Sequence, residues 1–252
     1  MNPSKACNFD CIYCQVDRST PPRVRKVQLD RLKKELENLL DAAIDQSLFA
    51  EAPFNLLDPA GRVIRDIAFS GDGEPTAYPR FTEAVRIAAE ARRSRKLTDT
   101  KIVLITDACY LAKPKVREAL RILDENNGEI WAKLDAGTQD YFAKVNRPNF
   151  PLTHVLANIL DAARVRPVVI QSLWMRINGE PPPACEVRAF AERLSEIVAN
   201  GGRIKLVQVY TIARQPAESF IAALSKAELD AVADAIRKVV ELPLEVYPGA
   251  AG

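Results

Sequence analysis

Residues 7–14 read CNFDCIYC and place Cys7, Cys11 and Cys14 within one short segment of the chain. The spacing C-x3-C-x2-C allows a single loop to bring three thiolates to one point. Tetrahedral zinc and ordinary electron-transfer iron–sulfur centres usually take four protein ligands, and no fourth cysteine lies nearby in the sequence. The segment therefore predicts a loop over residues 7–14 that holds a metal cluster and leaves one iron open.

Two other interpretations of the cysteines remain open at this point. A zinc knuckle could be completed by a distant residue, for which Cys109, Cys185 and His154 are the candidates. The three thiols could also be incidental. A non-catalytic zinc module that docks RNA or protein through the basic segment 16–26 is the corresponding alternative function.

The composition predicts a globular protein with one large core. The chain has 252 residues, of which 48% are hydrophobic and 27% charged, with a formal net charge of +2. These values are ordinary for globular proteins, and the charge neither requires nor excludes a polyanionic partner. Five cysteines, three of them in one loop, do not resemble a secreted disulfide framework. With no signal peptide or membrane-length apolar run, we expect a cytoplasmic protein without a membrane partner.

Hydrophobic periodicity predicts alternating strands and helices along the chain. The expected strands are residues 63–69, 101–105, 129–134, 168–173, 203–209 and 244–247. The expected helices are residues 28–49, 81–93, 114–126, 153–164, 186–200 and 226–240. Such alternation gives a parallel sheet with helices outside. The predicted fold class is α/β, a partial (β/α) barrel of about six parallel strands that forms one domain over residues 1–252.

Polar residues gather where these strands end, which is where barrels of this type bind ligands. The first strand runs into SGDGEPT, residues 70–76, in which Gly71 and Gly73 permit a sharp turn close to a ligand and Asp72 and Glu74 add carboxylates. The later strand ends carry further polar side chains: Thr106, Asp107, Lys133, Asp135, Gln171, Ser172, Gln208, Tyr210 and Thr211.

The cysteine spacing, with Tyr13 before the last cysteine and the glycine turn one helix and one strand later, resembles the radical S-adenosylmethionine (SAM) superfamily. The resemblance implies that Cys7, Cys11 and Cys14 hold a [4Fe-4S] cluster whose fourth iron binds SAM. It implies that Tyr13 lies against the adenine and that the turn Gly71 to Glu74 holds the methionine ammonium. The expected chemistry is reductive cleavage of SAM to a 5′-deoxyadenosyl radical.

The resemblance also carries expectations for the other strand-end residues and for a partner. Lys133 could balance the SAM carboxylate, and Asp107 or Asp135 could bind a ribose hydroxyl. Thr106, Gln171 and Tyr210 complete the expected cofactor-binding set. An external one-electron donor such as flavodoxin or ferredoxin is implied as the partner.

Three segments are similar to one branch of the superfamily, which groups with the tRNA wyosine-base synthesis enzymes. They are SGDGEPTAYPRF from residue 70, KLDAGTQDYFAKVNRP over residues 133–148 and LVQVYTIARQP over residues 206–216. The similarity implies that Lys133, Asp135, Asn146 and Arg147 line the cofactor and substrate pocket. Modification of RNA or a nucleoside is the expected reaction class, with hydrogen abstraction from a partner protein as the alternative.

We expect the remaining reactive side chains to have structural roles. His154 follows Pro151 at the start of a helix, where a capping or surface role is favoured over catalysis. Cys109 is expected to be a packing residue and Cys185 to be incidental. Too few ligands remain for a second iron–sulfur cluster.

The beginning of the chain leads to a further hypothesis. A barrel strand should run into the cysteine loop and typically needs about five residues, but only MNPSKA precedes Cys7. We therefore expect a first strand encoded upstream of Met1. Without it, the sheet edge at Val63, Ile64 and Ile67 should be open and prone to aggregation.

Overall fold

The computed structural model describes residues 4–214, 216 and 218–249 and contains a six-stranded parallel sheet in the order β1-β2-β3-β4-β6-β8. The strands are β1 (Asp66–Phe69), β2 (Lys101–Thr106), β3 (Gly128–Lys133), β4 (Val168–Leu173), β6 (Ile204–Tyr210) and β8 (Leu244–Tyr247). The order follows the sequence except that β5 and β7 belong to a separate small sheet. The predicted six-stranded α/β fold is confirmed.

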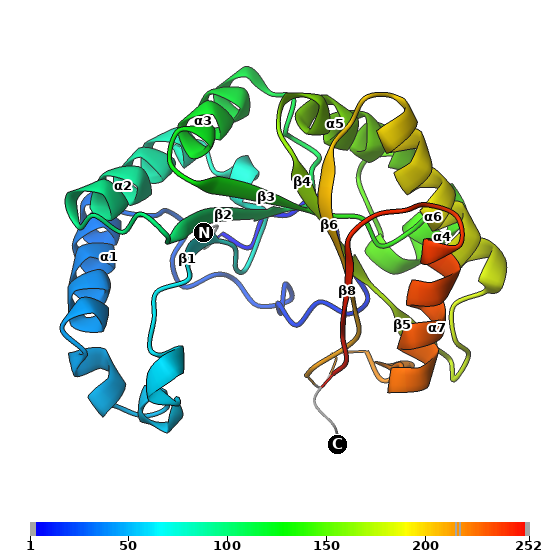
Figure 1. The fold of residues 1–252 in the computed structure, drawn as a ribbon, viewed down its shortest axis with the longest axis horizontal. Helices are drawn as coiled ribbons and strands as arrows, with labels where there is room; N and C mark the ends of the chain where they lie inside the picture. Colours follow the sequence, from blue (N-terminus) through cyan, green and yellow to red (C-terminus); the bar gives the residue numbers. More distant parts are fainter. Residues whose placement is uncertain (1–3, 215, 217, 250–252) are drawn as a thin grey trace.

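Six helices cover the outer side of the sheet, and the amino-terminal segment lies on the inner side (Figure 1). They are α1 (Leu29–Ile44), α2 (Phe81–Ser94), α3 (Pro114–Asp124), α5 (Leu152–Val165), α6 (Ala184–Ala199) and α7 (Lys226–Arg237). The central strands are rich in β-branched residues because both of their faces are buried. Ile102, Leu104, Ile130 and Ile170 are almost inaccessible to solvent.

Two predicted elements have different bounds in the structure. The expected helix over residues 28–49 ends at Ile44, and a 3-10 turn, η1 (Ser47–Ala50), follows it. The strand expected from Val63 begins at Asp66, which is the first residue in register with β2. The carbonyl of Ile64 accepts its hydrogen bond from the Thr100 hydroxyl (2.9 Å), so this part of the chain lies outside the ladder.

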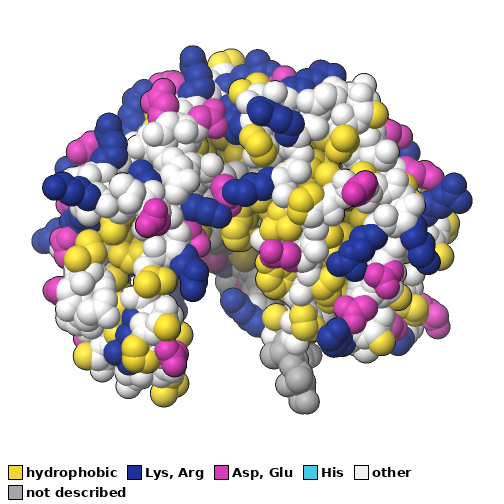
Figure 2. Space-filling view, in the orientation of Figure 1, with side chains coloured by type: hydrophobic (Ala, Val, Ile, Leu, Met, Phe, Trp, Pro, Cys, Tyr) yellow, Lys and Arg dark blue, Asp and Glu magenta, His cyan; other side chains and the backbone are white. Residues whose placement is uncertain are grey.

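The sheet does not close into a full barrel within the described residues. Among the described strands, β1 pairs with β2 alone and β8 with β6 alone, so both are edge strands. Figure 2 shows a deep indentation between the lobe that carries α1 and the part of the molecule that carries β8. Of the residues predicted at an open edge, Ile67 lies in the edge strand β1, whereas Val63 and Ile64 precede the strand. An upstream strand that would cover it stays a prediction.

Periodicity did not reveal three short elements beside the cysteine loop. Helix α4 (Gln139–Asn146) begins at Thr138, whose side chain accepts a hydrogen bond from the backbone N–H of Tyr141, and it ends at Arg147 in a left-handed conformation. Strands β5 (Met175–Ile177) and β7 (Ile221–Ala223) form an antiparallel pair. Together with the loop these elements bury a second apolar cluster: Ile12, Val145, Leu173, Met175, Ile177 and Ile221.

Candidate functional site

The cysteine loop is fastened at both ends by backbone hydrogen bonds. On one side the N–H of Glu74 donates to the carbonyl of Ala6 (2.8 Å), which joins the loop to the glycine turn. On the other side, the N–H groups of residues 10 and 12 donate to the carbonyls of Asn146 and Val145 (2.9 Å each) at the end of α4. The loop is therefore held between the end of β1 and α4.

The three cysteines line one cavity of about 150 Å³ together with most of the residues predicted for the site. The predicted residues on its wall are Cys7, Cys11, Cys14, Tyr13, Gly71, Gly73, Glu74, Thr106, Asp107 and Lys133. Six predicted residues are not part of this wall. Asp72 and Arg147 are exposed, and Arg147 pairs with Glu218 (3.1 Å). The other four lie behind the wall or deeper in the sheet: Asp135, Asn146, Gln171 and Tyr210. Gln171 donates to the side chain of Gln208 (2.8 Å).

Glu74 fixes the glycine turn against the end of β2. One of its carboxylate oxygens accepts hydrogen bonds from the backbone and hydroxyl of Thr76 and from the hydroxyl of Thr106 (2.7 Å). The other oxygen accepts from the N–H of Asp107 (2.8 Å). Gly71 has a φ of 123°, which side-chain-bearing residues rarely adopt. The side chain of Glu74 thus stabilises a turn that needs glycine.

Asp107 connects the end of β2 to the first cysteine. One of its oxygens accepts from the amide of Asn8 (2.9 Å) and lies 3.8 Å from the Cys7 sulfur, and the other accepts from the N–H of Cys109 (2.9 Å). Burial, followed by the charge of Asp107, raises the pKa of Glu74 to about 8 and that of Cys7 to about 11. Burial also raises the pKa of Asp107. Negative charge is therefore costly in this part of the site.

Asp135 joins four elements at the other side of the loop. One oxygen accepts from the N–H of Leu173 on β4 (2.8 Å) and pairs with the ammonium of Lys133 (3.3 Å). The other accepts from the hydroxyl of Tyr13 and from the amide of Asn146 (2.9 Å). Its side chain is completely buried, so Asp135 organises the site from behind the cavity wall.

Lys133 carries a positive charge at the cavity wall. Burial acts to lower the pKa of Lys133, but the Asp135 carboxylate and Tyr210 outweigh it and hold the pKa above its usual range. The ammonium donates to the Tyr210 hydroxyl and lies 5.1 Å and 4.8 Å from the ring centres of Tyr13 and Tyr210. Carboxylate and π faces together stabilise this cation.

The three residues that we expected to have structural roles lie outside the cavity: His154, Cys109 and Cys185. His154, near the start of α5, stacks on Phe150 at 4.6 Å, and its ring nitrogen lies 2.9 Å from the carbonyl oxygen of Cys109. Cys109 is buried, as expected for a packing residue, and Cys185 is exposed on α6. His154 is thus partly buried and contacts the backbone instead of capping its helix, whose N-cap residue is Pro151.

The zinc alternative needs ligands that all lie within bonding distance of one ion, at about 2.0–2.3 Å. Within the described part of the chain, no three His, Cys, Asp or Glu side chains are grouped closely enough to hold a single metal ion. A cluster places its cysteine ligands on different irons, so it does not require the sulfurs to share one ion.

Asn8 and Asn146 are two further site residues. The residue pattern did not indicate Asn8, and Asn146 was indicated only by the similarity to one branch of the superfamily. Both side chains are buried and hydrogen-bonded to site carboxylates. Asn8 directly follows Cys7, and this adjacency is the signal that could have found it. Asn146 lies 132 residues after Cys14, and only the fold brings the two segments together.

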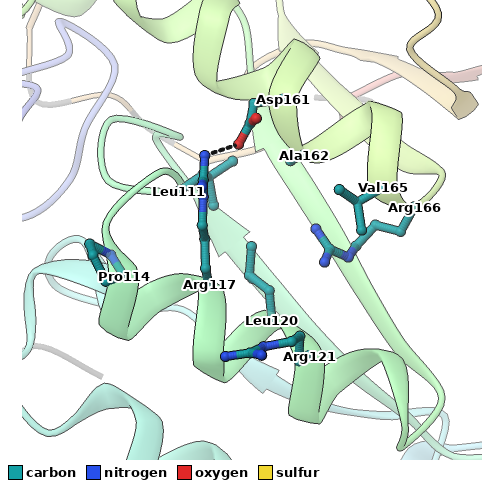
Figure 3. Close-up of a pocket in the computed structure, with 9 residues that line it drawn as sticks. All are labelled: Leu111, Pro114, Arg117, Leu120, Arg121, Asp161, Ala162, Val165 and Arg166. Carbon is teal, nitrogen blue, oxygen red and sulfur yellow. Dashed lines mark hydrogen bonds and ion pairs between the residues drawn. The ribbon is translucent and has the colours of Figure 1, made fainter.

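A cavity of about 420 Å³ lies elsewhere, between α3 and α5 on the outer side of the sheet (Figure 3). Its wall is formed by apolar residues and by Arg117, Arg121 and Arg166. Arg117 pairs with Asp161 across the cavity (2.7 Å), and Arg166 pairs with Asp124 (2.6 Å). None of the predicted site residues lines it.

A comparison of the chain with models of protein families bears on the cavity that the three cysteines line. The model of the Radical SAM superfamily matches residues 1–181. The chain belongs to this superfamily. Superfamily members in general cleave SAM reductively and use a [4Fe-4S] cluster, SAM and a reductant. None of the described helices is both long and apolar enough to cross a membrane.

Two curated relatives match most of this chain. The UPF0026 protein of Helicobacter pylori (strain J99) is 25% identical over 210 residues, which is 82% of this chain and 59% of that protein. A Brachyspira hyodysenteriae protein named GTPase Obg is 25% identical over 232 residues, which is 90% of this chain and 29% of that protein. The radical SAM chain described here therefore spans well under two thirds of the length of these relatives.

Solved structures share the fold of this radical SAM chain. A mutant of spore photoproduct lyase superimposes with a TM-score of 0.62 at 12% identity, covering 96% of this chain and 74% of the lyase. TYW1 with a bound lysine-pyruvate adduct gives a TM-score of 0.58 at 13% identity, covering 92% and 70%. At such low identity the likeness establishes the fold alone.

Proposed function

We propose that Cys7, Cys11 and Cys14 ligate a [4Fe-4S] cluster, that the adjoining cavity binds SAM, and that the enzyme modifies RNA or a nucleoside. The observation that carries the proposal is the single cavity lined by three cysteines and the glycine turn at the ends of parallel strands. A reduced cluster with an open iron would supply the electron that cleaves the SAM sulfonium.

The turn would provide backbone oxygens to the methionine ammonium. The carboxylate of Glu74 already accepts four hydrogen bonds from protein donors. Its main task in the proposed site is therefore to fix Gly71, Asp72 and Gly73, with direct contact to the ligand as a secondary one. Thr106 and Asp107 would border the same end of the ligand, because Asp107 also contacts Cys7.

Lys133 would face the carboxylate of SAM, since its raised pKa keeps it an ammonium at neutral pH. Tyr13 would lie against the adenine, with its hydroxyl held by Asp135. Asp135 is fully buried and has four donors, so its proposed role is to hold Tyr13 and Lys133 in place. Tyr210 on β6 and Gln171 on β4 would support Tyr13 and Lys133 from the sheet.

Cluster assembly tests the ligand assignment. Changing any one of Cys7, Cys11 and Cys14 to Ala should abolish the iron–sulfur absorption of protein reconstituted without oxygen. Cys109→Ala and Cys185→Ala are the matched controls and should keep about four irons per chain. Visible absorption that survives in Cys11→Ala would contradict the assignment.

SAM cleavage tests the cavity. The reduced wild-type protein should release 5′-deoxyadenosine slowly without substrate, and Glu74→Ala should weaken SAM binding while keeping the cluster. Chromatography that finds no 5′-deoxyadenosine under strong reduction would contradict the proposed reaction.

The substrate class and electron donor need separate experiments. Incubating the enzyme with SAM and either bulk tRNA or a protein extract, followed by mass spectrometry of nucleosides and peptides, should show a new mass in the nucleoside fraction. A new mass in the peptide fraction alone would instead favour an enzyme that activates a partner protein. Reduced flavodoxin or ferredoxin should replace the chemical reductant.

A further inference from the structure

The side-chain amide of Asn146 lies between two anionic groups of the site. Its Nδ2 is 2.9 Å from a carboxylate oxygen of Asp135 and 3.3 Å from the sulfur of Cys11. The side chain is completely buried. Its Oδ1 has no hydrogen-bond partner within the described residues. Flipping the amide would turn this oxygen toward a carboxylate and a sulfur, so the N–H groups must face them.

The position of this amide relative to Cys11 is fixed by the backbone. The carbonyls of Val145 and Asn146 accept hydrogen bonds from the N–H groups of Ile12 and Asp10 (2.9 Å each). These two bonds lie on either side of Cys11 in the loop. Helix α4 ends immediately after them, because Arg147 is left-handed (φ 43°) and Pro148 follows. The donor and the sulfur therefore move together.

The three cysteines have different neighbours. Cys7 lies beside the carboxylate of Asp107, and the guanidinium of Arg18 hydrogen-bonds to Cys14. The sulfur of Cys11 has the neutral amide of Asn146 as a donor, whose second N–H is held by Asp135, and the Tyr13 side chain also lies beside this sulfur. A hydrogen bond to a ligating sulfur stabilises its negative charge, and that charge is larger when the cluster is reduced. Such a donor therefore makes reduction easier.

We propose that Asn146 is a positioning residue that raises the reduction potential of the cluster through its hydrogen bond to the Cys11 sulfur. The inference rests on the proposed function, in which Cys11 is a ligand. It adds a role for the end of α4: this helix carries the group that makes the cluster easier to reduce by the electron donor. A purely structural role for Asn146 would change stability and leave the potential unaltered.

Redox titration followed by electron paramagnetic resonance tests the inference without measuring activity. Wild type, Asn146→Leu and the smaller, still polar Asn146→Ser are purified anaerobically, and iron and sulfide are counted first. The matched control is Asn158→Leu, because Asn158 is another buried asparagine but donates to the backbone carbonyls of Ala108 and Cys109. Both Asn146 variants should have a more negative midpoint potential, and the control should match wild type.

A second measurement covers the case in which neither Asn146 variant assembles a cluster. Reduced wild-type protein carrying ¹⁵N in its asparagine side chains should show coupling of that nitrogen to the cluster in pulsed paramagnetic resonance, and absence of the coupling would overturn the inference. Equal midpoint potentials in wild type and a cluster-containing Asn146 variant would also overturn it. If the wild type itself binds no cluster, the proposed function fails and the inference fails with it.

Discussion

Around Cys7, the buried carboxylates of Glu74 and Asp107 lie next to each other, whereas around Cys11 the buried carboxylate of Asp135 faces the ammonium of Lys133. We call these the Cys7 side and the Cys11 side of the site. Both use acidic residues at the ends of neighbouring strands, and both bind their carboxylates with backbone and side-chain donors. The difference is the nearest charge: Asp135 pairs with the ammonium of Lys133 at 3.3 Å, whereas Glu74 and Asp107 raise each other's cost of ionisation.

This difference shows that the same residue type can serve two purposes. On the Cys7 side, burial and mutual repulsion make ionisation costly, which is shown by the raised pKa values of Glu74 and Asp107. A cationic ligand would relieve that repulsion, and the proposed SAM ammonium is such a group. On the Cys11 side the charges already balance, so Asp135 acts as a fixed structural anchor.

The comparison is tested most strongly by removing one carboxylate charge from each side. Asp135→Asn leaves the Lys133 ammonium buried without its partner and should destabilise the protein by about 3–5 kcal/mol. Asp107→Asn removes a charge from a repulsive pair but turns one N–H toward a protein donor, so it should cost less, about 1–3 kcal/mol. Urea unfolding followed by circular dichroism measures both, and equal losses would remove the distinction between the two sides.

The pH dependence of stability should show the cost of ionising Glu74 on the Cys7 side. Glu74 has an ordinary pKa of 4.5 and a folded pKa of about 8. Between these values the unfolded chain is ionised and the folded protein holds the proton, so stability falls as the pH rises through this window and levels off above it. One proton corresponds to a slope of about 1.4 kcal/mol per pH unit.

Glu74→Gln should flatten this decline, because glutamine cannot ionise. Urea unfolding of wild type and the variant at pH 5, 6, 7 and 8 gives the two slopes. Parallel slopes would mean that Glu74 is ionised in the folded protein.

A smaller effect is expected from the hydroxyl that supports Lys133. Tyr210→Phe removes the hydrogen bond from the Lys133 ammonium to the Tyr210 oxygen but keeps the ring beneath the cation. The free energy of unfolding should fall by about 1 kcal/mol, less than for Asp135→Asn. A loss as large as that of Asp135→Asn would show that the hydroxyl, and not the carboxylate, holds the ammonium.

The sequence predicted the site best where its residues lie close together along the chain. The spacing of the cysteines and the order of residues in SGDGEPT carry their meaning locally, because a loop and a tight turn are set by neighbouring residues. The long strands and helices were also predicted, with errors of a few residues at Val63 and at the end of α1. At Val63 the chain leaves the ladder where the Thr100 hydroxyl bonds the carbonyl of Ile64, and α1 ends where Gln46 adopts a left-handed conformation.

Contacts between distant segments could not be predicted in this way. Asp135, which was one of two candidates for binding a ribose hydroxyl, lies behind the cavity wall, where it contacts residues from the cysteine loop, α4 and β4. Helix α4 has eight residues, too few for its periodicity to stand out. Strands β5 and β7 have three residues each and are separated by more than 40 positions.

The family, the parallel α/β architecture and the grouping of the three cysteines could be predicted from the sequence. They follow from local spacing and from the alternation of strand and helix patterns. The tertiary structure alone decided which strand-end side chains face the cavity, which carboxylate receives a counter-charge and which cysteine receives an amide donor. The physical reason is that burial and charge are set by neighbours in space. Asp107 and Asp135 follow similar strands in the sequence, yet one lies beside Glu74 and the other beside Lys133.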